Sequence, residues 1–187
     1  FFKYCMENLS DEEKKNIYYV IDKKAPDYEK IKEYDDHIIQ FMSLKHVLYV
    51  LAAVLYVASD SRTHLYAWRC KTSLIRSKID KRPIFFLQHG VTALKQVGPL
   101  FGRKGSSPMT YFATTSKFEQ DIVVKYLDYS EAKSPITGFT RWDVLEDTST
   151  KDDKLILLMP TWRSWLEEVS DEDFLKSEYY KNYFIFS

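Results

Sequence analysis

The stretch Pro83-Ile84-Phe85-Phe86-Leu87-Gln88-His89-Gly90 joins a run of apolar residues to a His-Gly pair. An unbroken apolar run predicts a strand that is buried on both faces, as in a parallel sheet. His89 then follows the carboxyl end of the strand, where open parallel sheets bind their ligands. Gly90 allows a tight turn and the close approach of a ligand.

A histidine in this place has two interpretations. Its imidazole can take up a proton near neutral pH, so His89 can act as a general base. It can equally close the strand with a hydrogen bond and take no part in chemistry. The strand and its histidine alone do not separate these alternatives.

On both sides of this stretch, apolar runs alternate with helix-like segments, which favours an α/β doubly wound domain with a parallel sheet. We expect this domain to cover residues 1–148 and a second such domain to begin within 149–187. Ser10, Ser43 and Ser116 stand at expected helix starts, and the first and last have Glu at capping-box spacing. The expected strands are 38–41, 54–58, 83–88, 111–114, 134–138 and 154–160. The expected helices are 4–25 (with a strand or helix end at 17–21), 45–52, 117–127 and 171–183.

Two segments favour irregular structure. Gly98, Pro99, Gly102 and Gly105 indicate a mobile loop. The acidic and polar stretch 145–153 indicates a linker between the two domains.

The composition excludes some classes of function. The 187 residues contain 27 basic and 27 acidic side chains, so the chain lacks the basic excess of proteins that bind nucleic acid through its phosphates. Cys5 and Cys70 are the only cysteines, which supports neither a disulfide framework nor a zinc site and fits a reducing, cytosolic compartment.

The sequence also bears on membranes and on length. No signal peptide is visible, and the most apolar segment, 47–58, is shorter than the roughly 20 residues that a spanning helix needs. The chain starts at Phe1 and stops within an apolar run, so we expect it to be part of a longer protein.

Two further segments carry polar groups directly after an apolar run. In 136–143, Arg141 offers a planar fork for phosphate oxygens, and Asp143 can orient it; the alternative is a surface ion pair of little value. In 159–164, Thr161, Arg163 and the backbone amides would form an anion site. The alternative there is a simple turn between domains.

The remaining candidates are weaker. Lys95 follows Gly90 closely and can meet a phosphate, although a solvated lysine is equally compatible with the sequence. His37 and His46 are interpreted as structural. His64 follows a strand end, and the structural interpretation is favoured for it too.

Four segments, taken in order, resemble the motifs of the CDP-glycerol glycerophosphotransferase family, the teichoic-acid primases and polymerases. The resemblance covers about residues 45–187. Two segments depart from the family form: Gln88 stands where the family has Trp before His-Gly-Thr-Pro, and the family's Gly-Tyr-Pro-Arg-Asn-Asp is Gly138 to Asp143 here. The four segments are Gln88 to Lys95, Ser116 to Glu119, Gly138 to Asp143, and Pro160 to Arg163.

The resemblance implies a GT-B architecture, with two Rossmann-like domains facing each other across a cleft. It implies a cytoplasmic enzyme, peripheral on the inner face of the cell membrane, where lipid-linked polyol-phosphate or glycan acceptors are presented. The family's second His and its donor-binding Asp and Ser segments would lie beyond Ser187. This chain would then hold the acceptor-side domain and the beginning of the nucleotide-donor domain.

The mechanism implied is transfer of glycerol phosphate from CDP-glycerol to an acceptor hydroxyl, with CMP as the leaving group. His89 would be the catalytic base. We expect neither a metal nor a cofactor. The expected donor- and phosphate-binding residues are Gly90, Lys95, Gly138, Arg141, Asp143, Thr161 and Arg163.

Two other functions remain open at this point. The same fold supports a sugar transferase that uses a nucleotide-sugar, and it also supports a non-catalytic module that binds a polymer. Membrane contact is suggested by basic residues around Leu74 and Ile75, although a solvated helix face is the alternative. These basic residues are Lys71, Arg76, Lys78, Lys81 and Arg82.

Overall fold

The computed structural model describes residues 1–65, 74–93, 95–150 and 169–183. The chain divides into two compact units, Phe1–Leu145 and Glu146–Ser187. The strand expected at 154–160, together with Thr161 and Arg163, lies outside the described residues. That the units are an acceptor-side and a donor domain stays a prediction.

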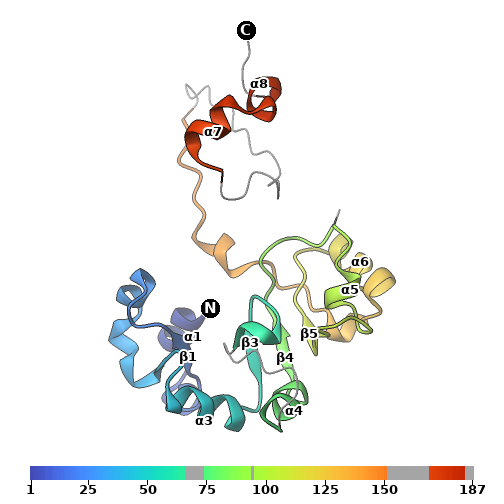
Figure 1. Cartoon of the computed structure of the whole chain (residues 1–187). Coiled ribbons are helices and arrows are strands. Elements are labelled where there is room, and N and C mark those ends of the chain that lie inside the picture. Colours follow the sequence, from blue (N-terminus) through green and yellow to red (C-terminus); the bar gives the residue numbers. More distant parts are fainter. Residues whose placement is uncertain (66–73, 94, 151–168, 184–187) are drawn as a thin grey trace. The chain divides into compact units, whose positions relative to one another are not determined.

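The first unit contains parallel strands, as the continuous apolar runs predicted (Figure 1). Its larger sheet has the order β3-β4-β5, with Val57 opposite Phe85 and Phe85 opposite Tyr111. The predicted run 134–138 adds one parallel bridge, between Thr114 and Ile136. The strands are β3 (Tyr56–Ala58), β4 (Ile84–Phe86) and β5 (Tyr111–Phe112).

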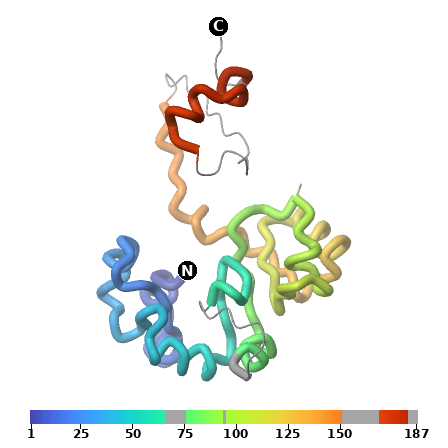
Figure 2. Tube along the Cα trace, viewed as in Figure 1, coloured from blue at the N-terminus to red at the C-terminus, as the bar shows by residue number. Residues whose placement is uncertain are grey.

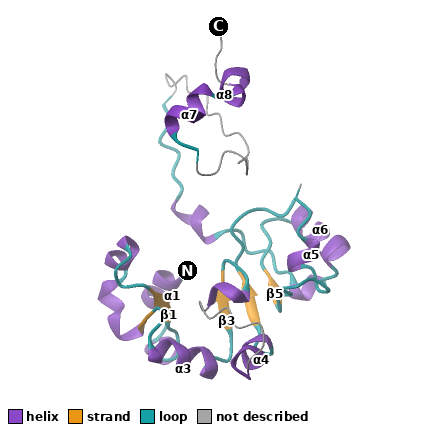
Figure 3. Ribbon diagram, in the orientation of Figure 1, coloured by secondary structure: helices purple, strands orange, loops and turns teal. Residues whose placement is uncertain are grey.

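A second, two-stranded parallel sheet pairs β1 (Tyr19–Ile21) with β2 (Ile38–Gln40). The described strands therefore lie in two small sheets, where the sequence led us to expect one doubly wound sheet. The fold class is mixed α/β with parallel strands. Helices lie around both groups of strands (Figure 3).

Serine caps set the helix starts that the sequence predicted. The Ser43 Oγ accepts the His46 N–H at the start of α3 (Leu44–Ala52), and the Ser116 Oγ accepts the Glu119 N–H at the start of α6 (Lys117–Leu127). Ser10 forms a complete capping box with Glu13. The other helices of the first unit are α1 (Phe2–Asn8), α2 (Asp11–Lys14), α4 (Leu74–Asp80) and α5 (Gly98–Phe101).

The single helix expected over 4–25 was wrong, whereas the strand alternative within 17–21 is confirmed by β1 (Tyr19–Ile21). The first helix ends at Asn8, Leu9 is extended with ψ of 158°, and Ser10 is extended with ψ of 160° because it serves as the cap of α2. Beyond α2 the chain forms β1 and then two 3₁₀ helices. The 3₁₀ helices of the first unit are η1 (Pro26–Lys30), η2 (Lys32–His37), η3 (Arg62–Leu65), η4 (Glu131–Lys133) and η5 (Thr140–Val144).

The segment 98–105, which we expected to be a mobile loop, contains the short helix α5 and tight turns. Phe101 is buried, and its ring centroid lies 4.8 Å from that of Phe86 with the two rings tilted, so its burial ties the segment to the core. The glycines are needed because the backbone approaches itself closely. A Cβ on Gly102 would lie 2.6 Å from the Gly98 carbonyl oxygen, and a Cβ on Gly105 would lie 2.7 Å from that of Leu100.

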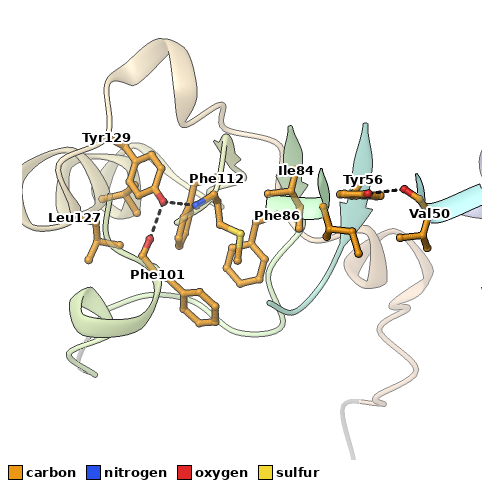
Figure 4. Close-up of a cluster of buried hydrophobic side chains, with 11 residues drawn as sticks. Val50, Tyr56, Ile84, Phe86, Phe101, Phe112, Leu127 and Tyr129 are labelled. Atoms are coloured by element: carbon orange, nitrogen blue, oxygen red, sulfur yellow. Dashed lines mark hydrogen bonds between the residues drawn. The ribbon is translucent and has the colours of Figure 1, made fainter. Parts of the chain in front are cut away.

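The core of the first unit joins the larger sheet to α5 and α6. Phe86 and Phe112 are almost fully buried and pack edge to face, with ring centroids 5.1 Å apart. The Tyr129 hydroxyl donates to the Phe101 carbonyl at 2.7 Å and accepts the Met109 N–H at 2.8 Å (Figure 4). Burial raises the pKa of this tyrosine above its usual value. The trace in Figure 2 shows the green and yellow segments of this core folded against one another.

His46 is structural, as predicted. Its ring is fully buried, its Nε2 lies 2.9 Å from the Leu65 carbonyl oxygen, and its Nδ1 accepts the Met42 N–H. Burial lowers the pKa of His46, so the neutral form is favoured.

In the second unit, the described helices are α7 (Asp171–Lys176) and α8 (Glu178–Tyr183). The Ser170 Oγ caps α7 by accepting the Asp173 N–H. Phe174 and Tyr180 pack edge to face, at 5.4 Å between centroids. The sequence predicted one helix over 171–183; the break falls at Ser177, whose backbone is extended.

We predict that Tyr129→Phe destabilises the first unit by about 1–3 kcal/mol, because the Met109 N–H and the Phe101 carbonyl lose their buried partner. Hydrogen exchange of peptides from residues 98–129 in the complete protein measures the effect. The matched control is Tyr126→Phe, since Tyr126 is 67% exposed. Equal exchange in both variants would contradict a stabilising role for the Tyr129 hydroxyl.

Candidate functional site

His89 lies at the carboxyl end of β4 with an exposed side chain, as the sequence predicted. Its Nδ1 is 2.9 Å from the carbonyl oxygen of Ser59, the residue that follows β3. A carbonyl oxygen only accepts hydrogen bonds, so Nδ1 carries the proton and Nε2 of the neutral ring keeps its lone pair. No residue within the described ranges bonds to Nε2. The two adjacent parallel strands thereby fix the tautomer that can accept a proton.

The backbone turns sharply just before His89. Gln88 has a φ of +62°, in the left-handed region that non-glycine residues rarely occupy. The Gln88 side chain is buried while His89 is exposed, so the turn separates an inward residue from an outward one. The Phe86 ring meets the His89 ring edge to face, at 6.3 Å between centroids.

Glu119 holds the loop that contains His89. Its carboxylate is fully buried and accepts the Thr92 N–H at 2.5 Å and the Gln88 Nε2–H at 3.2 Å. Its other oxygen accepts the N–H and hydroxyl of Thr115. The sequence predicted a capping box here, but the carboxylate turns inward to Thr115 and the His89 loop. The role of Glu119 in this loop was therefore missed, and its only sequence signal was the Ser-x-x-Glu spacing.

Arg141 lies beside His89, although 52 residues separate them in the sequence. Its Nη1 donates to the His89 carbonyl oxygen at 3.1 Å, and its guanidinium carbon is 4.3 Å from the centre of the Phe139 ring. Gly138, with a φ of +71°, provides the turn that places Phe139 and Arg141. Within the described parts of the chain, Arg141 has no other hydrogen-bond partner.

The other predicted residues are placed differently. Asp143 is exposed on η5 and forms no ion pair with Arg141, so the expected Arg141–Asp143 pairing is not formed in the described structure. Gly90 and Lys95 are exposed in the loop after β4, and a Cβ on Gly90 would meet nothing within 4 Å. The structure thus brings His89 and Arg141 together, with Gly90 next to them.

The arrangement places an imidazole and a guanidinium at one sheet edge. In the part of the chain that the structure describes, nothing bonds to His89 Nε2, and Arg141 has N–H groups available for an anion. Among the described residues, no three His, Cys, Asp or Glu side chains are placed to hold a metal ion, and metal independence stays a prediction. None of the described helices is both long and apolar enough to cross a membrane.

Comparison with known proteins supports the resemblance. The profile of the CDP-glycerol:poly(glycerophosphate) glycerophosphotransferase family matches residues 2–186. The chain is 29% identical to the minor teichoic acid biosynthesis protein GgaB of Bacillus subtilis (strain 168) over 197 aligned positions. The alignment covers 97% of this chain and 20% of GgaB, so the chain spans about a fifth of that relative. No solved structure matches it.

Four motifs in order, a histidine and an arginine meeting at one sheet edge, and a profile that covers nearly the whole chain agree with one another. The chain belongs to the CDP-glycerol:poly(glycerophosphate) glycerophosphotransferase family.

Proposed function

We propose that the complete protein transfers glycerol phosphate from CDP-glycerol to a hydroxyl group of a teichoic-acid-type or capsule-type acceptor. The observation that carries this proposal is the bond between His89 Nδ1 and the Ser59 carbonyl oxygen, which leaves Nε2 available. Family membership supports CDP-glycerol as the donor, and the similarity to a teichoic acid biosynthesis protein supports the class of acceptor.

In the proposed reaction, the acceptor oxygen attacks the phosphorus atom that carries glycerol. His89 Nε2 takes the hydroxyl proton as this oxygen–phosphorus bond forms. The bond between the two phosphates breaks, and its electron pair leaves with CMP. The acceptor therefore gains a glycerol phosphate diester, and one proton is passed on from His89 to solvent.

Arg141 supports this step through its charge. Its bond to the His89 carbonyl places the guanidinium next to the base, where negative charge on the phosphates develops. Stacking on Phe139 restricts the guanidinium plane without using its N–H groups. We assign Gly90, Lys95, Gly138 and Asp143 to the surroundings of the same donor phosphates, and Thr161 and Arg163 to the donor-facing part of the chain.

The GT-B architecture belongs to this proposal. It is supported by the parallel β3-β4-β5 sheet and by the position of His89 at the carboxyl end of a strand. We assign Phe1–Leu145 to the acceptor side and the second unit to the start of the nucleotide-binding side.

We predict that His89→Ala in the complete protein lowers kcat at least about 100-fold, because the acceptor hydroxyl loses its base. Product formation from CDP-glycerol, followed by mass spectrometry, measures the rate. His37→Gln is the matched control, since His37 bonds to the Ile17 carbonyl away from this loop. A His89→Ala rate within a few-fold of the unsubstituted protein would remove His89 from the mechanism.

The same assay decides between the other functions. A product formed from a nucleotide-sugar and not from CDP-glycerol would identify a sugar transferase. Retained acceptor binding without turnover of any donor would identify a polymer-binding module.

We predict that Arg141→Lys lowers kcat/KM for CDP-glycerol about 10-fold or more. Lysine keeps the positive charge but lacks the planar fork that both binds the His89 carbonyl and presents N–H groups to phosphate. Arg103→Lys is the control, because Arg103 is an exposed arginine in the same unit. Equal rates in the two variants would show that charge alone matters at this position.

Attachment to the inner face of the membrane is the remaining part of the proposal. Helix α3 exposes Leu44 and Leu48, at 76% and 57%, and it packs against α4, which carries Lys78. Exposed leucines beside basic residues suit an anionic lipid surface. Two basic residues of this region are partly engaged elsewhere: Arg76 pairs with Asp80, and Arg82 donates to the Leu51 carbonyl.

We predict that the double substitution Leu44→Asp with Leu48→Asp reduces co-sedimentation of the complete protein with anionic phosphatidylglycerol vesicles several-fold. The control substitutes the exposed Tyr126 of α6 by Asp. Unchanged sedimentation in the double variant would exclude α3 from membrane contact.

A further inference from the structure

The Glu119 carboxylate is buried at the meeting point of three segments. It is the third residue of α6 and is 0% exposed. One oxygen accepts from the loop after β4, through the Thr92 N–H and Gln88 Nε2. The other accepts from the N–H and hydroxyl of Thr115, at 2.7 and 2.8 Å.

All of these partners donate hydrogen bonds. The side chain at position 119 must therefore present an acceptor atom, and not a donor, on both of its sides. A carboxylate meets this requirement, because its two oxygens accept and neither donates. An amide in the same place would set an NH₂ group against donors on one side. This mismatch destabilises the folded state, because buried groups that lose their partners cannot form hydrogen bonds with water instead.

Two of the donors lie on either side of His89. Gln88 precedes it and Thr92 follows it, so the carboxylate holds both ends of the segment 88–92. The Thr92 hydroxyl also donates to the Gln88 Oε1 at 3.0 Å, which ties the two ends to each other. Gln88 Nε2 donates further to the Ala113 carbonyl, next to β5.

The same bonds hold the strained backbone at Gln88. A left-handed conformation at a non-glycine residue is strained and persists only where its surroundings enforce it. Here the buried side chain of Gln88 is fixed by bonds to Glu119, Thr92 and Ala113. This conformation directs Gln88 inward and leaves His89 exposed beside Ser59.

We propose that Glu119 is a positioning residue for His89: its buried carboxylate fixes the 88–92 loop so that the imidazole meets the Ser59 carbonyl and its Nε2 faces the acceptor. The proposal rests on the proposed function insofar as His89 is the base. Glu119 does not touch substrate, and it acts through the backbone on both sides of His89.

The test compares Glu119→Gln with Asp121→Asn in the complete protein. Both variants replace a carboxylate on α6 by its amide, but Asp121 is an exposed partner of Lys117. Two quantities are measured: kcat and KM with CDP-glycerol, and hydrogen exchange of peptides that cover residues 88–93 and 117–127.

For Glu119→Gln we expect kcat to fall about 10- to 100-fold, because a small displacement of the base is enough for such a loss. The KM for the donor should stay within about threefold, since ground-state donor binding does not use the carboxylate. Exchange should rise in residues 88–93 and not in α6. Asp121→Asn should match the unsubstituted protein in every measurement.

Thr92→Val provides a second, milder variant that keeps the backbone bond to Glu119 and removes only the hydroxyl link to Gln88. We expect its kcat to fall about 3- to 10-fold with the same local rise in exchange. If Glu119→Gln does not fold, the kcat and the hydrogen exchange of Thr92→Val test the positioning role of Glu119 instead.

Three results would overturn the proposal: an unchanged kcat in Glu119→Gln, a loss of activity with exchange raised equally in α6, or a rise in KM alone. If the unsubstituted protein does not turn over CDP-glycerol, the proposed function fails separately. Hydrogen exchange then still decides the positioning role, and unchanged exchange at residues 88–93 overturns it.

Discussion

The buried Glu119 carboxylate is the interaction on which the arrangement of the site depends. The carboxyl ends of β3 and β4 and the start of α6 are brought together by the parallel sheet, but the sheet alone does not orient a side chain beyond its end. The carboxylate does this by accepting bonds from both ends of the 88–92 loop. A charged acceptor is suited to the task because hydrogen bonds to a carboxylate are strong and are not screened by water when buried.

Backbone carbonyl groups hold both catalytic candidates. His89 is oriented by the Ser59 carbonyl, and Arg141 by the carbonyl of His89 itself. Carbonyl oxygens of this kind do not titrate, so they keep the His89 tautomer independent of neighbouring protonation. The arrangement includes a strained backbone at Gln88, and hydrogen bonds hold the side chain of this residue in place. Strain and rigidity therefore coincide immediately before the proposed base, as is common at functional sites.

Family membership and the local geometry support different parts of the functional proposal. The profile match gives the class of reaction, and the Nδ1–H bond of His89 gives a chemical reason for a base at that position. GgaB is a much longer chain than this one, and the alignment covers a fifth of it. In the proposed reaction, His89 acts on the acceptor hydroxyl and Arg141 on the donor phosphates.

The sequence by itself determined the parallel strands, the serine-capped helices and the place of His89 after β4. These features depend on local patterns: continuous apolar runs, and side-chain oxygens that cap nearby N–H groups. It did not determine the helix within 98–105 or the inward turn of Glu119. Only the tertiary structure decided those, because each depends on a partner distant in the sequence or on packing in the core. The contact between Arg141 and His89 is of the same kind: both residues were identified from the sequence, but the bond that joins them exists only once the chain has folded.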